Sequence, residues 1–271
     1  MNKGNIALKD ANFIERVKSM LKVDFYRMFT TSFFYIMAGI CFVMPILILV
    51  MTTMVQAPPV GTTYAPEVPS APMATFTNVW QIIGSVSGAS MAMDLTSMCN
   101  INMLYFFIAV LVCVFVSEDY KSGYCKNLFC SRAKKSEYVV SKTTVLSVSG
   151  ALLLICFIIG SLIGGKIANL SFDYGEAGAM GVILCMVSKI FMVGVFVPLF
   201  LAVSVAGKSK LWISLMGALF ASMLLYTMVP MIAPLNAGIM NVILCFAGGI
   251  TFSFGLGALS NLILKKTSVL Q

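Results

Sequence analysis

The side chains that most often carry out chemistry are scarce in this chain of 271 residues. It contains no histidine, which is the commonest general base and a frequent metal ligand. Serine and threonine are plentiful, but none stands in a nucleophile-elbow pattern with a base nearby in the sequence. The eight cysteines show no paired-ligand spacing. We therefore expect no enzyme, no metal site and no cofactor in this chain.

One segment comes close to a nucleotide-binding loop. Residues 160–166, GSLIGGK, satisfy most of a phosphate-binding motif, but Ile167 stands where the magnesium-binding Ser or Thr belongs. The motif also requires a strand before it, whereas this segment ends an apolar run. Gly160 and Gly164 are better interpreted as a small-residue face that lets another helix approach, or as fortuitous glycines.

Lys189 is the most unusual ionisable residue, because it interrupts an apolar stretch. If that stretch starts near residue 179, the ammonium lies deep in a bilayer, at a cost of about 2.5–3.5 kcal/mol. If it starts near residue 187, the side chain extends to the outer interface. A deep Lys189 would attract anionic substrate groups, which makes it a candidate residue of a substrate path. The sequence leaves both placements open.

These residues belong to a chain with the composition of a membrane protein. Its mean hydropathy is +0.96 and only 10% of its residues are charged, compared with roughly 25% in soluble domains. Backbone polar groups in a bilayer must bond internally, so long apolar runs predict helices. We predict an all-α polytopic membrane protein with six spans, at residues 33–56, 99–117, 143–165, 182–206, 211–234 and 239–264.

The distribution of charge predicts the orientation of these spans. Sixteen of the 18 Lys and Arg residues fall in the N-terminus, the loop after the second span, the turn before the fifth and the tail. Positive charge stays in the cytoplasm, so we predict that both termini and the 118–142 loop lie inside the cell. The pI near 9.1 then reflects topology in a plasma membrane, and we expect no nucleic-acid partner.

Two regions follow from this map: a cytoplasmic N-terminus at 1–32 and a transmembrane domain at 33–271. The outer loop at 57–98 opens with a proline-rich stretch, and its second half either lies on the outer interface or re-enters the membrane. The 118–142 loop is too long for a passive connector, so we expect it to contain a short cytoplasmic helix. In the N-terminus, apolar residues at helical spacing predict an amphipathic elbow helix, with a solvated leader as the alternative. The residues of this apolar stripe are Ile14, Val17, Leu21, Phe25 and Met28.

The loop after the second span also resembles a known signature. Residues 116–128, VSEDYKSGYCKNL, are similar to the cytoplasmic loop of type-2 permeases of ATP-binding-cassette exporters. In that family a Glu closes the second helix, a Gly follows, and an Arg and a Lys precede the third helix. The chain departs from the pattern at Tyr124, a usual Thr position, and has no Pro before Arg132. The residues that match in order are Glu118, Gly123, Lys126, Leu128, Arg132 and Lys142.

The resemblance implies an export permease driven by a separate ATPase. The complex would contain two ATP-binding subunits, which carry the ATP and Mg, and two permease chains, identical or paralogous. Glu118 and Lys142 would lock the loop to the elbow helix by ion pairing, and Glu137 would join the matching residues in ATPase coupling. Similar compact permeases of Gram-positive bacteria expel antimicrobial or amphipathic peptides, which suggests a hydrophobic or amphipathic substrate and a bacterial plasma membrane.

Two further expectations concern assembly and class. The export path would lie between the two permease copies, lined by the first, second and fifth spans, with close contacts at Gly39, Gly217, Ala221 and Ser222. The alternative to an exporter is an ATP-independent membrane protein with an immunity, sensor or structural role. An ATPase encoded beside this chain would distinguish the two.

Overall fold

The computed structural model describes residues 13–56, 76–85, 99–130 and 134–266. These residues are almost all helical, and within those ranges the only bridge between extended segments joins Asn78 to Ser171. Six helices are long and apolar enough to cross a membrane, which confirms the predicted all-α class and the six spans. They are α2 (Ser32–Gln56), α4 (Leu104–Lys121), α6 (Lys135–Ile167), α7 (Gly178–Gly207), α8 (Leu211–Ile232) and α9 (Ile239–Lys266).

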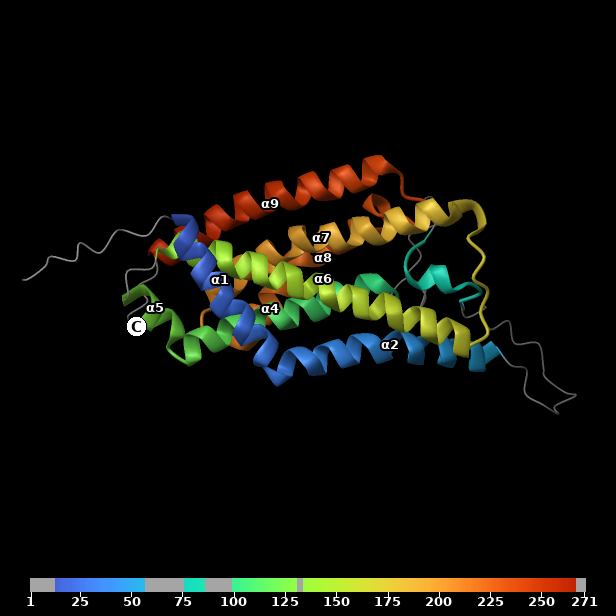
Figure 1. The fold of residues 1–271 in the computed structure, drawn as a ribbon, viewed down its shortest axis with the longest axis horizontal. Coiled ribbons are helices and arrows are strands. Elements are labelled where there is room, and N and C mark those ends of the chain that lie inside the picture. The colour runs from blue at the N-terminus through green and yellow to red at the C-terminus, as the bar shows by residue number, and fades with distance from the viewer. Residues whose placement is uncertain (1–12, 57–75, 86–98, 131–133, 267–271) are drawn as a thin grey trace, which may run out of the picture.

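The long helices run side by side along the longest axis of the molecule, and α7 contacts α4, α6, α8 and α9 (Figure 1). Helix α1 (Phe13–Thr30) crosses α6 obliquely, and the short α5 (Tyr124–Cys130) follows α4 at one end of the bundle. We term this end the basic end, because α1, α5, the α7–α8 turn and the last turn of α9 all carry Lys or Arg. The short α5 lies within the loop where a helix was expected.

Five of the six predicted spans match the helices to within five residues at each end, but α6 does not. It begins at Lys135 and not at residue 143. Its first turns are polar, but Glu137, Ser141 and Lys142 are all buried there. Helical structure therefore starts before the apolar run does, because tertiary partners satisfy the polar side chains of these turns.

Two glycines allow α6 to pack closely against α2. A Cβ added at Gly164 would lie 2.7 Å from the Cα of Ile46, and one added at Gly160 would meet the backbone oxygen of Phe42. The small-residue interpretation of these glycines is confirmed. The segment 160–166 lies wholly inside α6, so it has neither the strand nor the loop that a nucleotide-binding motif needs.

Residues 76–85 pack against the helix ends at the opposite end of the bundle. Val79, Ile82 and Ile83 are fully buried, and the short 3₁₀ helix η1 (Val79–Ile82) contacts α6. The indole Nε1 of Trp80 donates to the backbone oxygen of Phe172 at 3.1 Å. This part of the 57–98 loop forms no seventh span; the proline-rich half and residues 86–98 lie outside the described residues.

Replacing Gly164 with Leu should destabilise the chain by about 1–3 kcal/mol or more, because the new side chain would overlap the α2 backbone. The thermal unfolding midpoint of the purified chain in detergent measures this loss. Gly255→Leu in α9 is the matched control, since a Cβ there meets nothing within 4 Å. Equal midpoints for the two variants would show that α2 and α6 do not pack through this glycine.

Candidate functional site

The face of α1 that packs into the protein has a charged residue at its centre. Met20, Asp24 and Met28 are spaced four residues apart and are the buried residues of this helix. The predicted apolar stripe lies partly elsewhere: Ile14 is 76% exposed, and Val17, Leu21 and Phe25 are only half-buried. The helix itself is present as predicted, but it is rotated so that Asp24 points inward. Its position at a membrane surface stays a prediction.

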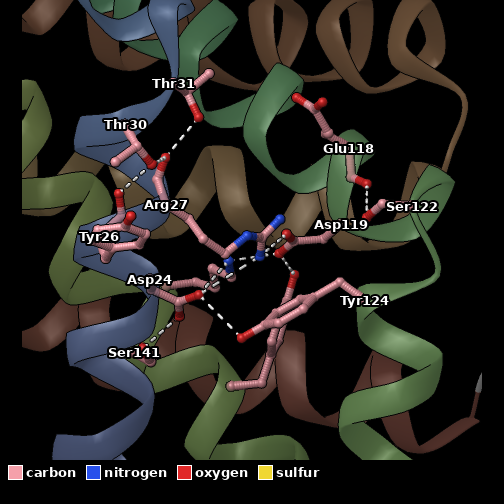
Figure 2. Close-up of polar contacts among 12 residues, drawn as sticks. Asp24, Tyr26, Arg27, Thr30, Thr31, Glu118, Asp119, Ser122, Tyr124 and Ser141 are labelled. Carbon is pink, nitrogen blue, oxygen red and sulfur yellow. Dashed lines mark hydrogen bonds and ion pairs between the residues drawn. The ribbon is translucent and has the colours of Figure 1, made fainter.

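Asp24 belongs to a cluster of four charged side chains from three helices. Lys142 of α6 lies at its centre, with its Nζ 2.9 Å from Asp24 Oδ1 and 2.7 Å from Asp119 Oδ2. Arg27 Nη1 lies 2.7 Å from Asp119 Oδ1, and Figure 2 shows this side chain of α1 reaching toward the end of α4. The side chains of Asp24, Asp119 and Lys142 are 0% exposed. Two positive and two negative charges therefore balance, and of the four side chains only that of Arg27 is partly exposed.

Neutral hydroxyl groups complete the hydrogen bonding of both carboxylates. Ser141 Oγ donates to Asp24 Oδ2 at 2.6 Å, and Tyr138 OH donates to Asp119 Oδ2 at 3.0 Å. Together with the ion pairs, these bonds leave each of the four carboxylate oxygens with a partner. A buried ion pair is stable only when its remaining lone pairs are satisfied, and this cluster meets that condition.

Aromatic rings line the same cluster. The guanidinium carbon of Arg27 lies 4.0 Å from the ring centroid of Tyr124 in α5, and Lys142 Nζ lies 4.1 Å from that of Phe115. Burial would lower the pKa of Arg27, but the charge and hydrogen bond of Asp119 outweigh it and raise that pKa. Burial and the two Asp charges raise the pKa of Tyr124 to about 12. The Tyr124 hydroxyl therefore stays protonated and can donate to Asp24 Oδ1, which lies 3.4 Å away.

A second ion pair fixes the start of α1 to the start of α6. Arg16 Nε lies 2.8 Å from Glu137 Oε1, and the Glu137 side chain is 1% exposed. Glu137 Oε2 also accepts the backbone N–H of Lys134 at 3.1 Å and so caps the first turn of α6. Because Arg16 precedes Asp24 by eight residues, α1 is held to α6 at two separate points along its length.

The predicted coupling residues do not all gather in this cluster. Lys142 does, and Glu137 lies beside it, but Glu118 is exposed and points away from the cluster (Figure 2). Asp119 makes the contacts to α1 that we predicted for Glu118, because adjacent helical residues project about 100° apart. Gly123, with φ +73°, turns the chain between α4 and α5. Lys126 is exposed on α5, Leu128 is half-buried, and Arg132 lies outside the described residues.

Lys189 lies in the interior of this chain. It is 1% exposed, and its Nζ donates to Asn102 Oδ1 at 2.6 Å. The hydroxyl of Tyr105 donates to the backbone oxygen of Lys189 at 2.9 Å. The ammonium therefore neither extends to an interface nor faces an open cleft in this structure. It links α7 to the residues at the start of α4, far from the four-charge cluster.

Comparison with known protein families, with characterised proteins and with solved structures finds no match to this chain. The resemblance to type-2 permeases thus depends on the loop signature and the pattern of spans alone, and the family stays a prediction.

Asp119→Asn should destabilise the chain by about 3–5 kcal/mol, because it leaves Arg27 and Lys142 with a single buried carboxylate. Denaturant titration of the detergent-solubilised chain measures this change. Glu118→Gln is the control on the neighbouring residue, whose carboxylate lies outside the cluster. Adding Lys142→Met to Asp119→Asn should recover part of the stability, since it removes the excess charge. Equal losses for Asp119→Asn and Glu118→Gln would contradict the cluster.

Proposed function

We propose that this chain is the membrane-spanning subunit of an ATP-binding-cassette exporter, which moves a hydrophobic or amphipathic substrate out of a bacterial cell. Antimicrobial peptides are the substrates suggested by the resemblance. Two copies, identical or paralogous, would associate with two cytoplasmic ATPase subunits that bind ATP and Mg. The basic end would face the cytoplasm of the cell, in line with the charge distribution.

The observation that carries this proposal is the four-charge cluster, because two of its residues come from the helices directly before and after α5 in the sequence. Asp119 lies two residues before the end of α4, and Lys142 lies in the first turns of α6. Both are bound to α1 by contacts of 2.7–2.9 Å. A force applied to α5 would therefore reach α1, α4 and α6 together. This is the mechanical property that a subunit without its own ATP site needs in order to respond to an ATPase.

One face of helix α5 packs against the rest of the chain, and the opposite face is exposed. Cys125 is buried, and Leu128 and Phe129 pack against the core, while Lys126, Asn127 and Cys130 are exposed. A short amphipathic helix with an exposed Lys can lie in a groove on another protein, with its apolar side retained by its own chain. This arrangement supports the predicted ATPase contact at Lys126, whereas Leu128 packs mainly against its own chain.

The surface of the bundle supports association of two copies through α2 and α8. Val43 and Leu47 of α2, and Phe220 and Leu224 of α8, are large exposed apolar side chains. Of the predicted contact residues, Gly39 and Ala221 are exposed, whereas Gly217 packs against Val203 and Ser222 is buried. The second span, α4, is mostly buried. We therefore place the contact between copies on α2 and α8 and assign α4 a smaller part of it.

The orientation of the bundle can be tested with single cysteines in a cysteine-free background. A cysteine at Lys134, at the start of α6, should resist an impermeant maleimide in intact cells, because the basic end faces the cytoplasm. A cysteine at Asp173, in the loop between α6 and α7, should react readily under the same conditions. The reverse labelling pattern would overturn both the topology and the export proposal.

Partnership with an ATPase gives a second test. The chain should co-purify with an ATPase encoded beside it, and Lys126→Glu on α5 should lower substrate-stimulated ATP hydrolysis about tenfold by weakening the contact. Lys22→Glu, an equivalent reversal on the exposed face of α1, should leave hydrolysis unchanged. Failure of any ATPase to bind would favour the ATP-independent class. Equal effects of the two charge reversals on ATP hydrolysis would show that α5 does not form the contact with the ATPase.

A further inference from the structure

A cleft of about 470 Å³ opens at the basic end, on the side of α4 that faces α8. This volume lies within the range of small-molecule sites in proteins, about 300–1,000 Å³. The cleft is separate from the four-charge cluster, which lies toward α1 and α6. The residues that line it are Val114, Ser117, Glu118, Lys121, Ser122 and Leu211.

Three of the four polar side chains of this cleft lack partners among the residues that the structure describes; the fourth, Ser122, donates to the backbone oxygen of Glu118 at 2.7 Å. Glu118 and Lys121 are exposed, and neither side chain forms an ion pair or a hydrogen bond there. Ser117 is 2% exposed, and its hydroxyl is buried with no hydrogen-bond partner. A buried unsatisfied hydroxyl is costly, so a ligand that bonds to Ser117 would remove a cost that the protein otherwise bears.

The groups that line the cleft differ in charge and polarity. The Glu118 carboxylate lies in the last turn of α4, where the exposed carbonyl groups of a helix end also favour a cation. Lys121 is the last residue of the same turn and favours an anion. Val114 of α4 and Leu211, the first residue of α8, are the apolar residues that line the cleft. A ligand that matches all of these groups has an ammonium, an anionic group close to it, and an apolar tail.

We propose that this cleft binds the headgroup of a zwitterionic amphipath, of which an aminophospholipid such as phosphatidylethanolamine is the simplest example. The ammonium of the ligand lies against Glu118, its phosphate accepts from Lys121 and the Ser117 hydroxyl, and its acyl chains run past Val114 and Leu211. An anionic lipid would leave Glu118 opposed by like charge. The binding site does not depend on the export proposal.

Native mass spectrometry of the full-length chain in detergent tests this site without any ATPase. Incubated with equal amounts of phosphatidylethanolamine and phosphatidylglycerol, the wild-type chain should retain roughly two- to fivefold more phosphatidylethanolamine. Glu118→Gln should abolish the preference, and Lys121→Gln should lower retention of both lipids. Glu15→Gln and Lys22→Gln on α1 are controls that change the same residue types outside the cleft, and they should leave the preference intact.

Soluble glycerophosphoethanolamine separates recognition of the headgroup from recognition of the acyl chains. It should compete with the bound lipid in the wild-type chain and not in Glu118→Gln. Equal retention of the two lipids by the wild type, or equal effects of Glu118→Gln and Glu15→Gln, would overturn the site. Either result would leave the ATPase and topology tests of the export proposal untouched, because those depend on α5 and on the direction of the bundle.

Discussion

The placement of α1 against α4 and α6 follows from the cost of burying charge. Asp24, Asp119 and Lys142 are each enclosed by protein, and none of them could be removed from water alone without a penalty of several kcal/mol. Lys142 contacts both carboxylates only where all three helices meet, and Arg27 supplies the second positive charge. Helix α1 can therefore dock in one register, the one in which Asp24 lies against Lys142 and Arg27 against Asp119. The apolar contacts of Met20 and Met28 would tolerate other registers.

The sequence predicts the spans well and the cluster poorly, for a physical reason. Apolar runs are local signals, because they are visible in consecutive residues, and the six helices follow from them. An ion pair joins residues that are far apart in the chain, such as Asp24 and Lys142, and no local pattern shows which charges will meet. The neighbours Glu118 and Asp119 are chemically alike, and only the rotation of α4 decides that Asp119 faces α1. A charged residue between Met20 and Met28, on what would otherwise be an apolar stripe, was the available signal for Asp24.

Lys189 illustrates the same limit at the other end of α4. Its apolar neighbours indicate a span, but its partner Asn102 lies 87 residues earlier in the chain. The amide of Asn102 and the hydroxyl of Tyr105 make polar contacts to α7 at one end of α4, and Asp119 makes ionic contacts to α1 and α6 at the other. Helix α4 is thus attached to different neighbours at its two ends. This fits its position as the most enclosed span.

The separation of Asp24 from its partners along the chain also sets an order of events during synthesis. Helix α1 is the first helix of the described chain to be made, yet Lys142 follows Asp24 by 118 residues. At about 5–20 residues per second, that interval lasts roughly 6–24 seconds. Until the third span has been made, the Asp24 carboxylate has only Arg27, 4.0 Å away on the same helix, as a charged partner and no site in which to be buried. Helix α1 therefore reaches its final position only after α6 has been made, and its docking reports that the first three spans have been assembled.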